Sequence, residues 1–220
     1  MLLGDGFIPA GATPVKGMKA ITGFLAELTC GNDERAEAVV ERIVALPPAQ
    51  VEELLEELQI LLVSPEADIR WWATRALAAL PDARVVSLLV KVLEDEDASV
   101  RQCAALGLRL HARAQLSVLL SQAIPALVTA LADNDNLVAR LASDALGEIG
   151  EAAVPALLEV MQSDLQQARL EAVRALAAIG DQRSIPVLFA ALDEDSALME
   201  YWATEALQRM GVGMMYFSPE

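Results

Sequence analysis

The sequence predicts an all-α chain folded as a solenoid of stacked helical hairpins, and three observations support this prediction. A motif recurs at intervals of 31, 38, 30 and 31 residues, with copies that begin at Ile69, Val100, Val138, Ala168 and Met199. Such a period is typical of stacked helix pairs. Hydrophobic residues make up 55% of the chain but aromatic residues only 4%, because much of the apolar content is Ala and Leu, which favour helices. Finally, prolines stand at expected helix starts and glycines just past expected helix ends.

The N-terminal part divides into an irregular segment and a helix. Residues 1–14 hold several Gly and Pro residues without any period, which predicts an irregular lead. Residues 15–29 predict a helix that caps the first full repeat. Its apolar face would consist of Met18, Ile21, Phe24, Leu25 and Leu28.

Two further helices precede the regular repeats. Asn32 opens the first of them, and Pro47 and Pro48 end it. Residues 50–63 form the second, with an apolar face on one side and four acidic side chains on the other: Glu52, Glu53, Glu56 and Glu57. Carboxylates at this spacing resemble a metal site. Because the opposite face of the helix is apolar, we favour the interpretation that the acidic face is exposed to solvent.

Regular helical hairpins follow. Their first helices begin at Pro125, Pro155 and Pro186, where a proline removes no helical hydrogen bond. Their second helices end before Gly150, Gly180 and Gly211, which predicts a backbone with positive φ just past the last turn. Acidic runs at residues 95–97, 133–135 and 193–195 precede the second helices, and we interpret them as caps of the positive helix ends.

One face of each second helix is apolar and contains small residues. In the central copy this face is Val138, Ala142, Ala145, Leu146 and Ile149, at the spacing of one helical side. The small alanines predict close approach between neighbouring helices.

Two segments depart from the pattern. Residues 111–122 hold the surplus of the 38-residue interval and predict a longer helix or loop. Residues 212–220 form a C-terminal tail in which Met214, Met215, Tyr216 and Phe217 follow the last glycine. We favour a folded-back cap over the last repeat, with a partner-binding peptide or a dimer contact as alternatives.

The charge and the cysteines limit the possible partners and compartments. With 16 Lys and Arg against 32 Asp and Glu, the formal charge is −16, which disfavours nucleic acid because phosphate binding depends on cationic side chains. Cys30 and Cys103 are too dispersed for a disulfide framework. The sequence shows no signal peptide and no apolar run long enough to cross a bilayer, so we expect a cytoplasmic protein without membrane contact.

Catalytic and metal-binding constellations are not evident. Cys103 lies eight residues from His111, about 12 Å along an unbroken helix, too far for a thiol–imidazole pair. Phosphate loops, paired-cysteine zinc spacings and nucleophile elbows are missing from the sequence. We therefore predict no catalytic, cofactor-binding or metal-binding residues and no cofactor.

A family resemblance rests on three features of the repeats. These are the motif openings Ile69-Arg70 and Val100-Arg101, the run from Ala145 to Gly150, and the helix start at Ile185-Pro186. The chain resembles short HEAT repeats of the phycobilisome-lyase type over residues 32–211. The resemblance implies a right-handed α-solenoid of HEAT-like hairpins, a single domain at 15–211 with about six helical pairs, and a concave face lined by the second helices. A branch of such proteins holds iron with repeated His-Glu pairs, but His111 is the single histidine and Ala112 follows it.

Aromatic and arginine side chains on the second helices are the candidate partner-binding residues, because both types are frequent binding anchors. Trp71-Trp72 and Tyr201-Trp202 occupy the same two places in two copies of the motif. An alternative has Trp72 and Trp202 packed between repeats. The full set is Trp71, Trp72, Arg75, Arg140, Arg174, Tyr201 and Trp202.

Two functions remain at this point. The first expectation is a non-enzymatic scaffold that binds a protein partner in its concave groove, with an oligomeric state that the sequence leaves open. The alternative, which rests on the resemblance, is a bilin lyase subunit or an antenna-processing chaperone that handles a tetrapyrrole. In that alternative the aromatic side chains stack on the pigment and the arginines pair with its propionates.

Overall fold

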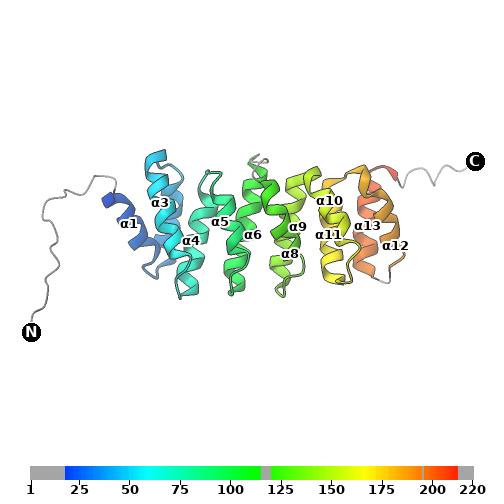
Figure 1. The fold of residues 1–220 in the computed structure, drawn as a ribbon, viewed down its shortest axis with the longest axis horizontal. Helices are drawn as coiled ribbons and strands as arrows, with labels where there is room; N and C mark the ends of the chain where they lie inside the picture. The colour runs from blue at the N-terminus through cyan, green and yellow to red at the C-terminus, as the bar shows by residue number, and fades with distance from the viewer. Residues whose placement is uncertain (1–17, 115–119, 195, 213–220) are drawn as a thin grey trace, which may run out of the picture.

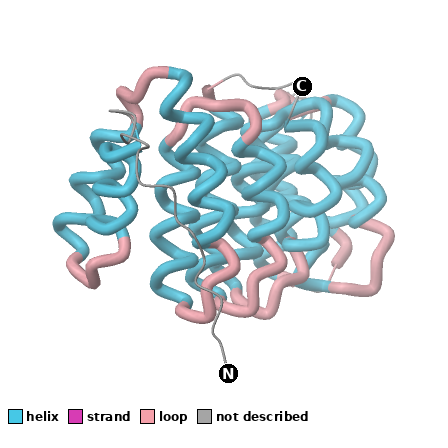
Figure 2. The backbone as a smooth tube through the Cα atoms, turned by 60° about the vertical axis from the view of Figure 1, so that its left-hand side comes forward, coloured by secondary structure: helices cyan, strands magenta, loops and turns pink. Residues whose placement is uncertain are grey.

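The chain forms an elongated array of helices that runs from one end to the other in sequence order (Figure 1). The structure, a computed structural model, describes residues 18–114, 120–194 and 196–212. Within these residues only helices, turns and loops occur (Figure 2). The prediction of an all-α solenoid is confirmed. The predicted lead at 1–14, the centre of the 111–122 segment and the tail residues Met214 to Phe217 lie outside the described residues.

The described helices pair into consecutive hairpins, each with a first and a second helix. The first helices are α1 (Met18–Leu28), α3 (Pro48–Leu61), α5 (Val85–Val92), α8 (Ile124–Ala130), α10 (Val154–Val160) and α12 (Ile185–Leu192). The second helices are α2 (Asp33–Ile43), α4 (Ala67–Ala79), α6 (Ala98–Arg113), α9 (Asn136–Ile149), α11 (Gln166–Ile179) and α13 (Ala197–Arg209). Short 3-10 turns lead into three first helices: η1 (Ser121–Ala123), η2 (Gly150–Ala153) and η3 (Gln182–Ser184).

Helix ends follow the local sequence. Asp97 and Asp135 each accept hydrogen bonds from two backbone N–H groups in the first turn of α6 and α9, as expected for N-caps. The cap of α13 differs from the prediction, because Ser196, one residue past the acidic run, accepts the bond from Met199 N–H. Gly180 ends α11 at φ 70°, in the left-handed region.

The second helices pack closely because their facing residues are small. Ala142 and Ala172 are both 0% exposed, so the alanine positions predicted to allow close approach are buried. Neighbouring second helices contact one another over much of their length, whereas neighbouring first helices touch at few points. The second helices therefore form the more closely packed layer of the array.

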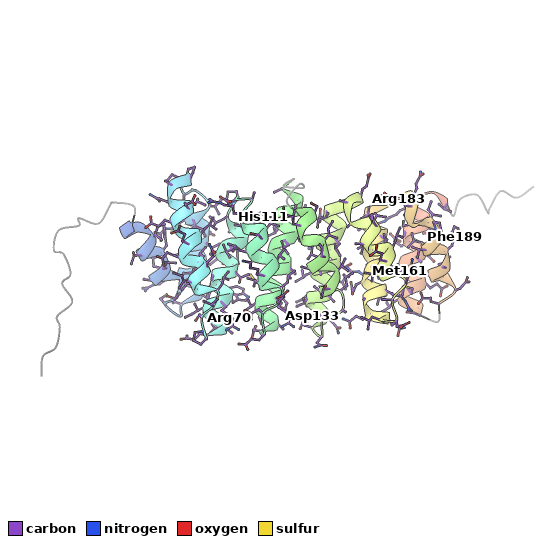
Figure 3. All side chains as sticks on the ribbon, in the orientation of Figure 1. Arg70, His111, Asp133, Met161, Arg183 and Phe189 are labelled. Carbon is purple, nitrogen blue, oxygen red and sulfur yellow. The ribbon has the colours of Figure 1, made fainter. Side chains whose placement is uncertain are left out.

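Arginine and acid side chains link successive hairpins at one edge of the array. Arg70 donates to Asp95 at 2.8 and 2.9 Å, and Arg101 donates to Asp133 twice at 2.8 Å. Figure 3 shows Arg70 and Asp133 at this edge, with His111 at the opposite one. Each arginine also donates to backbone carbonyls at the turn of its own hairpin. A third link joins Arg169 to Glu194 at 2.7 Å.

The interface between the fourth and fifth hairpins lacks this link. At the arginine position α9 carries Ala139, which is fully buried, and the aligned acceptor position is Ser163. The Ser163 hydroxyl is buried without a hydrogen-bond partner in the described structure. The sequence thus replaces both partners together, which avoids leaving one charge buried alone.

Candidate partner-binding surface of the second helices

The candidate site is the solvent-facing side of the second helices, which we call the inner surface. All the predicted partner-binding residues belong to these helices, although their environments differ. The inner surface is made of Trp71, Trp72, Arg75, Leu106, Arg109, Leu110, Arg140, Asp144, Glu171, Arg174, Tyr201 and Trp202.

At the N-terminal end, Trp71 and Trp72 lie together at the wall of a pocket. Their rings meet edge to face with centroids 4.8 Å apart. Both rings are half-buried and pack against the main hydrophobic core, so neither is wholly a core residue. The pocket is open to solvent and has a volume of about 640 Å³. The turn between α1 and α2, the start of α4 and Ser99 of α6 supply its other walls. We call it the tryptophan pocket.

Arg75 lies next to this pocket but is already engaged. Its guanidinium forms an ion pair with Glu37 of α2, and both side chains remain partly exposed. The pair joins neighbouring second helices across the inner surface. A partner anion that approached Arg75 would therefore compete with Glu37.

In the C-terminal half, Arg174 occupies the centre of a charged cluster. Asp144 accepts from Arg174 at 3.0 Å and lies 3.5 Å from Arg109, and Glu171 also pairs with Arg174. The Arg174 side chain is only 10% exposed. Its guanidinium lies over the Trp202 ring, 5.2 Å from the centroid, a cation–π contact. Arg174 and Trp202 therefore hold α9, α11 and α13 together.

Tyr201 and Arg140 are the accessible members of this half. Tyr201 is 57% exposed and meets Trp202 edge to face at 5.1 Å. Arg140 is exposed, and no carboxylate in the described part of the chain pairs with it. Leu106 and Leu110 also expose apolar surface, but they belong to α6, which α9 and α11 separate from α13. The C-terminal half thus combines an unpaired cation with an exposed aromatic ring.

Six of the seven predicted residues fall into two groups that the array keeps apart, and Arg140 of α9 belongs to neither. The structure brings Trp71, Trp72 and Arg75 together at one end, and Arg174, Tyr201 and Trp202 together at the other. The sequence reasoning assigned Asp144 to the same repeat position as Arg174 but did not predict that Asp144 and Glu171 engage Arg174. A signal was present, because Asp144 occupies in α9 the place that Arg174 occupies in α11.

The inner helices also contain a thiol and an imidazole. Burial raises the pKa of the Cys103 thiol to about 12, so it is a thiol and not a thiolate at neutral pH. Burial lowers the pKa of His111 against the opposing effect of hydrogen bonds to backbone groups of α4, so the imidazole is neutral there. No group of three or more His, Cys, Asp or Glu in the described ranges is arranged to hold a metal ion. None of the helices found there is long and apolar enough to span a bilayer.

Comparison with known proteins identifies the repeat. The family model for HEAT repeats matches residues 51–143 and 124–208. A solved complex of CpcE and CpcF of the phycocyanin lyase from Nostoc sp. PCC7120 has a TM-score of 0.54 and is 20% identical, covering 86% of this chain and 98% of that one. That similarity concerns the fold.

Sequence relatives carry names from pigment–protein assembly. A protein of Pseudanabaena tenuis named "uncharacterized phycocyanin operon protein Z" is 30% identical over 165 residues, 72% of this chain and 80% of the relative. The phycocyanobilin lyase subunit beta of the same organism is 36% identical over 113 residues. That match covers 51% of this chain but only 38% of the lyase subunit.

These relatives correct one expectation from the sequence. The prediction of a non-enzymatic protein is wrong, because the similar proteins whose names state an activity are lyase subunits. Periodicity and composition describe the scaffold, which many activities share. A missing catalytic motif is therefore weak evidence when similar proteins are named as subunits of an enzyme.

Proposed function

The chain belongs to the HEAT-repeat proteins of the phycobilisome-lyase type, and from this membership we propose that it serves in the attachment of bilins to proteins. Its role is that of a lyase subunit or a pigment chaperone, which holds a tetrapyrrole for transfer to a cysteine of an acceptor protein. The observation that carries the proposal is the similarity to phycocyanobilin lyase beta subunits of two cyanobacteria.

The C-terminal half of the inner surface has the chemistry that a bilin requires. An open-chain tetrapyrrole is a conjugated, largely apolar molecule with two propionate groups. The exposed ring of Tyr201 offers an apolar face for contact. Arg140 is exposed and unpaired within the described structure, so it is available for a charge-assisted bond to a propionate.

Arg174 orients the Trp202 side chain. The Arg174 guanidinium is fixed by Asp144, Glu171 and the Trp202 ring, so it sets the position of the Trp202 indole and not of a free ligand. A fixed aromatic ring on α13 and an unpaired cation on α9 would allow one part of an extended pigment to stack while its carboxylate is paired.

The proposal includes a protein partner. The chain spans less than two fifths of the lyase subunit beta of Pseudanabaena tenuis, and the solved phycocyanin lyase is a complex of two different chains. The two cysteines of this chain are an exposed Cys30 and a buried Cys103, and the raised pKa of Cys103 opposes a nucleophilic role. The chemistry of attachment would then fall to the acceptor thiol and a second chain.

Co-expression in a bilin-producing host tests the proposal. We expect the purified chain to carry a visible absorption band. Arg140→Glu combined with Tyr201→Ala should lower the bound pigment about tenfold, the effect of losing one charge-assisted bond. Lys91→Glu is the matched control, because Lys91 is exposed on the first-helix layer. A colourless wild-type protein from cells that contain the bilin would refute the proposal.

A further inference from the structure

We propose that the tryptophan pocket binds an arginine side chain presented by a protein partner. The pocket lies at the N-terminal end of the array, and its walls include both indole rings and carboxylates of three helices or turns. This proposal concerns a second site and a different ligand from the pigment surface, so it does not depend on the proposed function.

The shape of the tryptophan pocket suits a side chain. Its volume of about 640 Å³ falls in the range of sites that bind small organic groups. Trp71 and Trp72 are fixed against the core by partial burial and by their edge-to-face contact. Rigid rings lose little conformational entropy when a ligand binds, which favours their use as anchors.

The charge of the pocket selects a cation. Four carboxylates line it, those of Asp33, Glu37, Glu66 and Asp68, and no Lys or Arg is among the lining residues. Glu37 is neutralised by Arg75 at the margin. The other three form no ion pair within the part of the chain that the structure describes. An entering guanidinium would supply the missing counter-charge.

The combination of indoles and carboxylates favours arginine in particular. A guanidinium is planar, stacks on aromatic faces and pairs with carboxylates in a forked geometry, and it is more weakly hydrated than an ammonium group. The same charges exclude the propionates of a bilin from this end. The two ends of the inner surface are thus opposite in preference, with an anion-accepting Arg140 in one half and a cation-accepting pocket in the other.

Calorimetric titration with the blocked peptide acetyl-Gly-Arg-Gly-Arg-Gly-amide tests the inference. We expect saturable binding that weakens as salt is raised, because exposed charges are screened. Trp71→Leu, which retains apolar bulk without the π face, should raise the dissociation constant about tenfold. Glu66→Gln with Asp68→Asn should raise it by a similar factor while leaving the circular dichroism spectrum unchanged.

Two controls make the result decisive. Glu56→Gln with Glu159→Gln removes the same number of exposed charges from first helices, away from the tryptophan pocket, and should leave the dissociation constant unchanged. The peptide with Glu in place of Arg should not bind. Equal affinity of wild type and the Glu66→Gln, Asp68→Asn variant, equal binding of both peptides, or no saturable heat would each overturn the inference. None of these outcomes affects the pigment band of the co-expressed chain.

Discussion

Replacement of Arg101 by alanine should destabilise the array far more than its position near the protein surface suggests. Arg101 donates two hydrogen bonds to the carboxylate of Asp133 in the next hairpin, both at 2.8 Å. It also donates to the backbone carbonyls of Asp95 and Glu96 at 2.8 and 3.1 Å. The substitution removes all four bonds and leaves Asp133 without its cation.

The magnitude follows from burial. The Arg101 and Asp133 side chains are only 15% and 12% exposed, and removal of one partner from a buried ion pair costs roughly 3 to 5 kcal/mol. Asp133 also accepts from the backbone N–H of Asp135 at 2.8 Å, which stabilises the remaining carboxylate. We therefore expect the substitution to lower the free energy of unfolding by about 3 kcal/mol, at the low end of this range.

Urea denaturation followed by circular dichroism measures this loss, with Arg35→Ala as the control because Arg35 is an exposed arginine outside every ion pair of the described residues. The double variant Arg101→Ala, Asp133→Ser copies the Ala139 and Ser163 combination that the chain uses one interface later. It should recover much of the loss, with a coupling energy above about 1 kcal/mol. Additive losses in the two single variants would refute the reasoning.

Three further predictions concern the core, the response to acid and the thiols. Ala172→Leu should lower the free energy of unfolding by about 1 to 3 kcal/mol through overpacking, since Ala172 is fully buried between helices; a melting temperature equal to that of wild type would contradict this packing. Burial acts to raise the pKa of the Asp95 carboxyl, but hydrogen bonds from Arg70 and the Asp97 N–H hold this pKa below its usual value. The stability that Asp95 contributes is therefore complete above the unfolded pKa of about 3.9 and is lost as the pH falls through the lower folded pKa. Asp95→Asn should thus flatten the acid side of a stability–pH profile, and an unchanged profile would exclude this role. Iodoacetamide at neutral pH should modify the exposed Cys30 and spare the buried Cys103 until the chain unfolds. Peptide mass spectrometry can identify the modified thiols. Rapid modification of both thiols in the folded protein would argue against the described packing of α6.

The sequence predicts the array well because periodic patterns encode helix faces directly. Prolines, glycines and alanines marked the hairpins at Pro125, Gly180 and Ala142, and the structure places each as expected. These signals are local, so one helix and its own neighbours determine them.

The pairing of charged side chains could not be obtained in the same way. Arg174 was predicted as a free partner-binding residue, whereas its contacts with Asp144 and Trp202 depend on the distance and rotation between three successive helices. The acidic runs were interpreted as helix caps, but Asp95 and Asp133 accept the arginines of the preceding hairpin. Periodicity assigns a residue to one face of its helix. Which charged side chain it pairs with depends on the distances and rotations between helices of neighbouring repeats.

The hydrophobic interior is divided into two pieces, and this division affects the inner surface. Trp71 and Trp72 pack against the main cluster, whereas Trp202 packs against a second cluster formed by parts of α11, α12 and α13. Helix α11 belongs to both clusters, because Ala172 and Leu176 lie in the main one and Val173 and Ala177 in the second. The two tryptophan sites of the inner surface therefore rest on different parts of one stack, and α11 is the helix through which a change of packing at one part reaches the other.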